Sequence, residues 1–328
     1  MKRFAMAALA GLTLALTGTA SLAQGTYPTK PIRVIVPYAP GGTTDVVARL
    51  VAEQARQTLG QAIVVDNKPG ASGLIAIQEL VRSAPDGYTV MIGNISTNAL
   101  TPILMQKRMP FDYDKSVQPV ARLANLPLML LGTTKGFEPK NLKEVIDYAR
   151  ANPNQVRYAS AGLGSFQNID IEHLAHRAKV KFSHISNKSG GSGMMRDIGN
   201  GDAQITMFST LNGGNMIRQG LGRGLAVVMD SRHKAYPDVP TMAEAGYPGV
   251  GGGQWQAAFV PAGTPKEIVE KLSKAFQDAL KQPQVVNAYE KGDIIAPDPH
   301  TPEQAQAWIA GEMKKWREVI KEINIVLD

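Results

Sequence analysis

The fold is decided by residues 32–60, which read IRVIVPYAPGGTTDVVARLVAEQARQTLG. The stretch opens with five mostly apolar residues, 32–36, a length typical of a buried strand. Residues 37–42, which contain two prolines and end in Gly41 and Gly42, then form a loop. Apolar residues recur at helical spacing from Val46 to Ala55, and Gly60 ends the pattern. The segment therefore predicts a strand, a glycine-rich loop and a helix, which is the repeating unit of an α/β fold.

The same unit recurs along the chain in two separate sets. Further strands, each leading through a loop of small polar residues into a helix, are expected at 62–65, 89–92, 157–159, 182–185 and 205–208. Strands that alternate with helices form parallel sheets, because each helix carries the chain back to the starting edge. The sequence thus predicts two mostly parallel sheets flanked by helices, one for each set.

Two stretches break this rhythm. Residues 123–132 are extended and contain Pro127, and residues 237–254 are rich in proline and glycine. We interpret them as the two strands of a hinge, with one lobe formed by 24–124 and 250–328 and the other by 125–249. Near the end of the chain, Thr264 and Thr301 each precede a proline, which predicts N-caps for two closing helices.

The composition excludes several classes of protein. The 328 residues contain no cysteine, which excludes thiol catalysis, disulfides and cysteine-ligated metal sites. The formal net charge of +7 is spread along the chain without a run of five basic residues, and only 6% of residues are aromatic. Nucleic-acid binding is therefore not expected.

The first residues predict export. Lys2 and Arg3 precede an apolar stretch that lasts to Leu16, and Ser21 and Ala23 form the small-x-small pattern of a signal-peptidase site. An uncleaved anchor is the alternative, but the stretch is shorter than the roughly 20 apolar residues that span a bilayer. We expect residues 1–23 to be a signal peptide that is cleaved after Ala23, and the mature protein to be periplasmic.

The motifs of common enzymes are absent from the sequence. It contains no G-x-S-x-G, Walker or H-E-x-x-H motif. A metal site is conceivable at Glu172, His173, His176 and His184, although such residues are more often surface or packing groups. We expect no catalytic residue, metal or cofactor.

The loops after the strands carry the strongest functional signal. They are built from Gly, Ser, Thr and Asn, and they precede helices whose first N–H groups are unpaired and partially positive. Such loops are suited to holding an anion. Each loop alone could be an ordinary turn, but five of them in two lobes favour a ligand cleft.

Several single residues keep two interpretations. Asp45 could face a ligand or cap its own helix, and Lys68 and Lys188 could contact an anion or lie in solvent. Tyr38 and Phe166 could line the ligand site or pack within their own lobes.

Seven motifs resemble one known family. They lie at 36–45 (VPYAPGGTTD), 66–73 (DNKPGASG), 85–89 (PDGYT), 110–113 (PFDY), 158–165 (YASAGLGS), 237–246 (PDVPTMAEAG) and 261–265 (PAGTP). In this order they resemble the Bug family, the TctC-type receptors of tripartite tricarboxylate transporters. The resemblance covers essentially the whole mature chain.

The resemblance implies a periplasmic-binding-protein (Venus flytrap) fold, whose two lobes close by a hinge on a small organic carboxylate. It also implies delivery of the ligand to the large and small membrane subunits of a transporter, and we expect the receptor to be a monomer. We expect the ligand site to be formed by Tyr38, Gly41, Gly42, Thr43, Thr44, Ser96, Asn98, Ser160, Gly162, Gly164, Ser165, Lys188, Gly190 and Ser209.

Departures from the family pattern bear on the ligand. Asn98 and Asn168 stand where the family usually has histidine, and Ser209 replaces a frequent aspartate. Because that aspartate is a candidate partner for an amine, we favour a mono- or dicarboxylate, aliphatic or aromatic, over an amino acid. Two alternatives remain open, namely a ligand sensor for a membrane signalling system and a secreted hydrolase or isomerase that uses a Ser or His of the cleft, such as Ser160.

Overall fold

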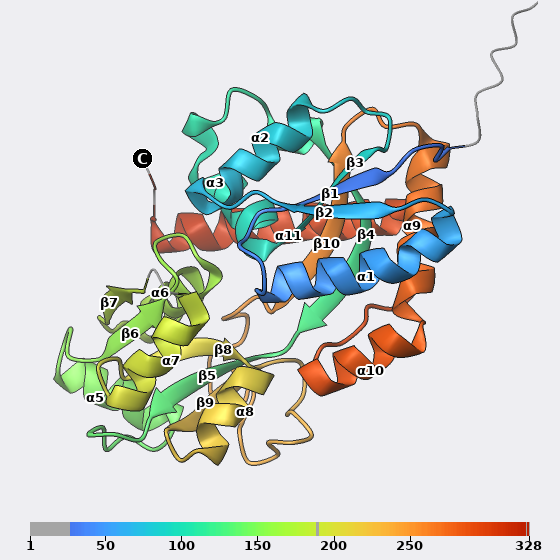
Figure 1. Cartoon of the computed structure of the whole chain (residues 1–328). Coiled ribbons are helices and arrows are strands. Elements are labelled where there is room, and N and C mark those ends of the chain that lie inside the picture. Colours follow the sequence, from blue (N-terminus) through green and yellow to red (C-terminus); the bar gives the residue numbers. More distant parts are fainter. Residues whose placement is uncertain (1–26, 188–189, 326, 328) are drawn as a thin grey trace, which may run out of the picture.

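A computed structural model describes residues 27–187, 190–325 and 327, and it folds into two lobes (Figure 1). The expected signal peptide, its cleavage site after Ala23, and Lys188 lie outside the described residues. The predicted two-lobed α/β fold with mostly parallel sheets is confirmed.

Lobe 1 is built on a five-stranded sheet in the order β2-β1-β3-β10-β4. Strand β1 pairs in parallel with β2 and β3, whereas β10 is antiparallel to both β3 and β4. The strands are β1 (Ile32–Val36), β2 (Ile63–Asn67), β3 (Thr89–Asn94), β4 (Val117–Leu126) and β10 (Gln254–Pro261).

Helices cover both faces of this sheet. Alternate residues of β1 point to opposite faces, so that Val34 packs in the core with α1 and α9, while Ile35 packs in the core with α2 and α11. The helices of lobe 1 are α1 (Thr43–Leu59), α2 (Leu74–Arg82), α3 (Thr101–Leu104), α4 (Tyr113–Ser116), α9 (Lys266–Leu280), α10 (Pro283–Gly292) and α11 (Pro302–Ile323).

Lobe 2 repeats this plan with the order β7-β6-β8-β5-β9. Strand β6 is parallel to β7 and β8, and β5 is antiparallel to β8 and β9. The strands are β5 (Leu128–Thr133), β6 (Arg157–Ser160), β7 (Ser183–Ser186), β8 (Ile205–Ser209) and β9 (Gly222–Val228). The helices are α5 (Leu142–Ala151), α6 (Phe166–Ala178), α7 (Gly190–Asn200) and α8 (Thr210–Arg218).

The chain crosses between the lobes where the sequence indicated a hinge. The first crossing is Pro127, since β4 of one sheet continues through it into β5 of the other. The second crossing, residues 229–253, returns from β9 to β10. It is not the strand that we predicted, because Gly249, Gly251 and Gly253 adopt positive φ angles that interrupt an extended chain.

One predicted helix cap is confirmed and one is wrong. Thr301 caps α11 in a capping box with Gln304. Thr264 does not cap α9, because the hydroxyl of Thr264 donates a hydrogen bond to the carbonyl of Pro261 at 2.7 Å and Pro265 occupies the cap position.

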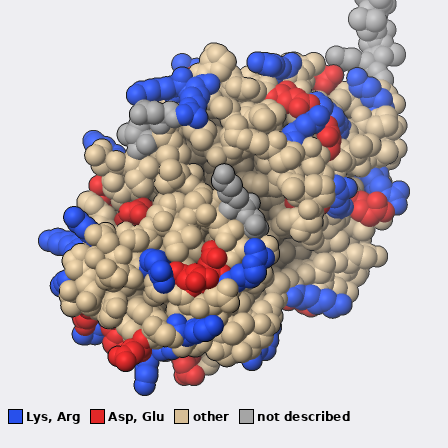
Figure 2. Space-filling view, turned by 60° about the vertical axis from the view of Figure 1, so that its left-hand side comes forward, with Lys and Arg blue, Asp and Glu red and all other residues tan. Residues whose placement is uncertain are grey.

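The surface charge agrees with the diffuse surplus found in the sequence. On the face in Figure 2, basic and acidic side chains are interspersed and do not form a single extended patch. Among the described residues, no helix combines the length and the apolar character needed to cross a bilayer.

Candidate functional site

A cavity of about 210 Å³ lies between the lobes. By volume it has room for about seven water molecules, and therefore for a small organic molecule. Lobe 1 and lobe 2 contribute equally to its wall, which consists of Tyr38, Ser72, Asn94, Ser96, Thr101, Ala161, Leu163, Gly164, Ser165, Phe166, Gln167 and Gln254.

In lobe 1 the wall is organised around Asn94, the last residue of β3. The side-chain oxygen of Asn94 accepts hydrogen bonds from the Tyr38 hydroxyl at 2.7 Å and from the Ser96 amide at 3.0 Å. The amide group of Asn94 donates to the Thr44 hydroxyl at 3.2 Å. Burial raises the pKa of Tyr38 to about 12, so its hydroxyl stays neutral and remains a donor. These bonds fix Tyr38, Thr44 and Ser96 relative to one another.

The loop before α1 is held by Asp45. The buried Asp45 carboxylate accepts hydrogen bonds from the Gly41 amide at 2.9 Å and from Arg49 and Asn67. Although burial alone would raise it, these hydrogen bonds lower the pKa of Asp45 and keep the group ionised. Asp45 therefore fixes the loop before its own helix and does not line the cavity. Gly41, Gly42 and Thr43 are exposed at the start of α1 and do not line the cavity.

In lobe 2 the wall is formed by the N-terminus of α6. Ser165 is its N-cap, with its hydroxyl accepting a hydrogen bond from the Asn168 amide at 3.4 Å. The next amide, that of Phe166, donates to the Ser96 hydroxyl at 3.3 Å. This hydrogen bond joins the lobes directly at the cavity.

The glycine amides of the 160–165 loop are already paired. The Gly164 amide donates to the Asn168 side chain, and the Gly162 amide donates to the Ser160 hydroxyl, each at 3.0 Å. The Ser160 hydroxyl also lies 2.6 Å from Nε2 of His184, whose pKa is lowered by burial. Ser160 is fully buried and does not line the cavity, so its contacts shape the loop.

The other predicted residues lie elsewhere. Asn98 is fully buried and its amide donates to the Tyr113 hydroxyl at 2.8 Å, so its side chain points into lobe 1. Ser209 caps α8, and Gly190 begins α7. Four of the predicted residues line the cavity, namely Tyr38, Ser96, Gly164 and Ser165.

Several lining residues were not predicted. Gln167 lies in the first turn of α6, directly after the serine- and glycine-rich loop. This position in the sequence could have indicated that Gln167 lies near the ligand site. Gln254 begins β10 at the end of the second crossing. Of the residues with two interpretations, Phe166 lines the cavity, whereas Lys68 pairs with Asp66 at 3.3 Å.

The four residues of the conceivable metal site do not form one cluster, and each contacts another part of the protein. Glu172 accepts a hydrogen bond from Tyr158, and His184 contacts Ser160. His173 and His176 each lie 3.6 Å from Glu322 of α11. Within the described part of the chain, no group of three or more His, Asp or Glu side chains could hold a metal ion.

A buried carboxylate lies at a second contact between the lobes. Asp170 of α6 is 1% exposed and faces Lys315 and Glu312 of α11 and the amide of Gly252. Burial raises the pKa of Asp170 to about 7, although Lys315 and the Gly252 amide oppose the shift. Its Oδ1 atom has no hydrogen-bond partner among the described residues.

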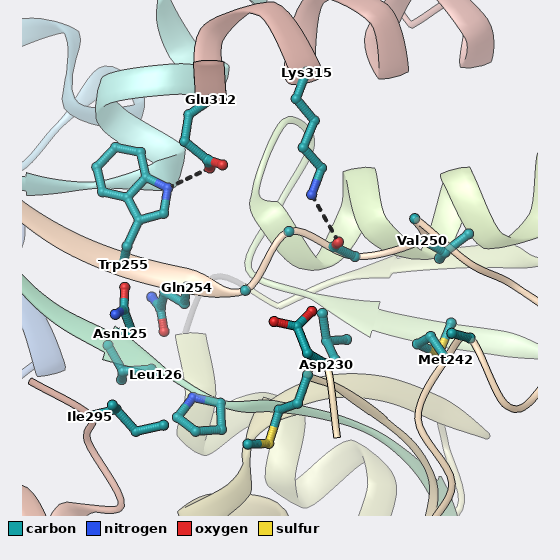
Figure 3. Close-up of a pocket in the computed structure, with 18 of the residues that line it drawn as sticks. Asn125, Leu126, Asp230, Met242, Val250, Gln254, Trp255, Ile295, Glu312 and Lys315 are labelled. Carbon is teal, nitrogen blue, oxygen red and sulfur yellow. Dashed lines mark hydrogen bonds between the residues drawn. The ribbon is translucent and has the colours of Figure 1, made fainter. Parts of the chain in front are cut away.

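A larger cavity of about 560 Å³ borders both crossings and α11 (Figure 3). Within it, the Trp255 indole donates to Glu312 at 2.8 Å, and Lys315 donates to the Gly251 carbonyl at 3.2 Å. None of the predicted site residues lines this cavity. We assign it to the predicted hinge, because most of its lining residues come from the two segments that connect the lobes.

The packing of the second crossing predicts that Gly252→Ala destabilises the protein. A Cβ at Gly252 would lie 2.0 Å from the ring of Trp316, which is fully buried. Overpacking of this kind costs about 1 to 3 kcal/mol. Urea unfolding should therefore show a lower free energy of unfolding for Gly252→Ala, with Gly311→Ala of α11 as the control, because a Cβ there meets no atom within 4 Å and neither glycine has a positive φ. Equal losses in the two variants would contradict the packing argument.

Comparisons with known proteins agree with this architecture. The family model described as "Tripartite tricarboxylate transporter family receptor" matches residues 47–325. BugT from Bordetella pertussis is 32% identical, and the match covers 98% of both chains.

Two solved structures are also similar. MatC from Rhodopseudomonas palustris with bound malate is 32% identical with a TM-score of 0.79, and the match covers 90% of this chain and all of MatC. Another R. palustris protein, solved with adipate, is 29% identical with a TM-score of 0.80, and the match covers 92% of this chain and 99% of that protein. The chain therefore belongs to the TctC family of periplasmic solute-binding receptors, which includes the Bug proteins.

Proposed function

We propose that the protein binds a small organic carboxylate between its lobes, closes on it and delivers it to the large and small membrane subunits of a tripartite tricarboxylate transporter. The proposal includes a mature monomer that starts after Ala23 and is periplasmic. Its lobes are 24–124 with 250–328, and 125–249. Because the TctC family consists of solute receptors and not of enzymes, we regard Ser160 and His184 as a structural pair.

The observation that carries the proposal is the cavity bounded by both lobes, with the N-terminus of α6 at its wall. The first amides of a helix lack intrahelical partners and carry partial positive charge, which attracts a carboxylate. The malate and adipate found with two relatives support this chemistry. The loop of Gly41 to Thr44 at the start of α1 would meet the ligand from lobe 1, at the rim of the cavity.

Closure follows from the position of the ligand. A ligand that contacts both lobes stabilises the closed arrangement through interactions that the open arrangement lacks. The Phe166 amide and the Ser96 hydroxyl belong to different lobes, so their hydrogen bond forms only when the lobes meet. No Asp or Glu is among the described residues that line the cavity, which favours an acid without an amine.

The ligand class is tested by thermal unfolding with a panel of mono- and dicarboxylates, each compared with its neutral amide. A ligand that binds the native state at 100 times its Kd adds about 2.7 kcal/mol of apparent stability. We expect at least one acid to raise the Tm and its amide to leave it unchanged. If amides stabilise the protein as strongly as acids, or if no acid of the panel does, the ligand class is wrong.

Closure is tested by spin labelling, which is simplified because the chain contains no native cysteine. Labels at Arg82→Cys on α2 and Arg196→Cys on α7 report on the two lobes from exposed positions. We expect the distance distribution between them to shift to shorter values when the ligand saturates the protein. The matched pair Arg82→Cys and Gln57→Cys, both in lobe 1, should not change. A ligand that binds without shifting the first pair would refute closure.

A further inference from the structure

The polar groups that line the cavity are mostly paired with each other. Asn94 bonds Tyr38, Ser96 and Thr44, as described above. The Thr101 hydroxyl donates to the Ser72 carbonyl at 2.8 Å, and the Ser165 hydroxyl donates to the Gly162 carbonyl at 2.7 Å. These groups are committed to holding the shape of the wall.

Gln167 is different. It is 7% exposed and lines the cavity, yet its side-chain oxygen has less than 1 Å² of accessible surface and no hydrogen-bond partner among the described residues. Buried acceptors are normally paired, because an unpaired one costs free energy that a partner would recover. Because no described residue pairs with this oxygen, a turn of the amide group towards the cavity breaks no hydrogen bond of the oxygen, and a ligand donor would then supply the missing partner.

The chemistry of that donor is limited by the surroundings. The amide oxygen repels a carboxylate oxygen, since both are acceptors, so it is suited to a different part of the ligand from the carboxylate. A hydroxyl and an ammonium group are both possible donors. With no Asp or Glu among the described lining residues, an ammonium would lie in the cavity without an opposite charge, whereas a hydroxyl needs none.

We propose that Gln167 is a specificity-determining residue that accepts a hydrogen bond from a hydroxyl group of the ligand, and that the ligand is a hydroxycarboxylate. This inference rests on the proposed function. The carboxylate lies near the first amides of α6, and the hydroxyl lies beside it at the Gln167 side chain, so one helix end recognises both groups.

The test compares acids that differ only by a hydroxyl, such as malate with succinate and 2-hydroxybutyrate with butyrate, by titration calorimetry of the mature full chain. For the pair that fits the cavity, we expect the hydroxy acid to bind about 5- to 30-fold more tightly than its parent. Gln167→Met keeps the size of the side chain but removes the acceptor. It should weaken binding of the hydroxy acid by a similar factor and leave binding of the parent acid within about twofold.

Gln254→Met is the matched control, because it changes another glutamine of the same wall. It should preserve the ratio of the two affinities. The inference is overturned if hydroxy and parent acids bind equally to the wild type, or if Gln167→Met weakens both to the same extent. If no carboxylate binds at all, the proposed function fails and this inference fails with it.

A second measurement does not depend on a ligand. Removing an unpaired buried acceptor relieves its desolvation cost, so Gln167→Met should have a Tm equal to or above that of the wild type in the absence of ligand. A clear fall in this Tm would show that the oxygen is already paired within the protein, which would overturn the proposal.

Discussion

Asp170→Asn is expected to abolish a fall in stability that the wild type undergoes between about pH 4 and pH 7. Burial raises the pKa of Asp170 to about 7 in the folded protein, from 3.8 for the free group. Between these values the folded state holds a proton that the unfolded state releases, so the contribution of this carboxyl to stability decreases as the pH rises. The shift corresponds to a loss on the order of 4 kcal/mol, complete above pH 7.

The measurement is urea unfolding of the wild type and of Asp170→Asn at pH 5, 6, 7 and 8. Both proteins contain His173, so the difference between their free energies of unfolding removes the contribution of this residue. That contribution has the opposite pH dependence, because burial lowers the pKa of His173. The variant should gain stability over the wild type with each step towards pH 7, because Asn does not ionise in this buried position. Asp197→Asn, which removes the same charge on α7, should show no such trend. A constant difference across the pH range for Asp170→Asn would refute this account of the α6–α11 contact.

Ala161→Trp is expected to weaken ligand binding by up to about 100-fold while the fold is retained. Ala161 is exposed on the 160–165 loop and lines the cavity, so a larger side chain has no core of its own lobe to disrupt. In the closed protein, the indole would occupy much of the 210 Å³ that the ligand needs. Overpacking a closed site costs up to about 3 kcal/mol, which corresponds to this loss of affinity.

Titration calorimetry with the acid that stabilises the wild type most measures the affinity and checks this prediction. The Tm without ligand shows whether the fold is retained. Ala151→Trp, at an exposed position at the end of α5, is the matched control and should bind the ligand normally. Undiminished binding to Ala161→Trp would mean that the ligand lies outside the cavity between the lobes.

The sequence predicted the arrangement of the chain better than the direction of its side chains. Apolar periodicity located the βα units, and the lapse at 123–132 located the first crossing, because both depend on local patterns. Asn98 was misplaced for a different reason. A π-helical turn at Ser96–Leu100 follows β3 directly, and its wider spacing points Asn98 towards Tyr113 while Ser96 faces the cavity.

Other features depend on contacts between distant segments. Asp170 is buried only because α11, more than 130 positions later in the chain, packs against α6. Gln167 is notable because its oxygen is unpaired, and no sequence pattern reports a missing partner. The glycine amides that suggested an anion site are bonded to Asp45, Ser160 and Asn168, so the small residues indicated the location of the site without revealing which groups remain free.

The most direct test is a crystal structure of the protein with the acid that stabilises it most. We expect the carboxylate in the cavity, beside Ser96 of lobe 1 and the N-terminus of α6 in lobe 2, within hydrogen-bond distance of both lobes. A carboxylate found in the cavity at the hinge, or bound by one lobe alone, would contradict the account.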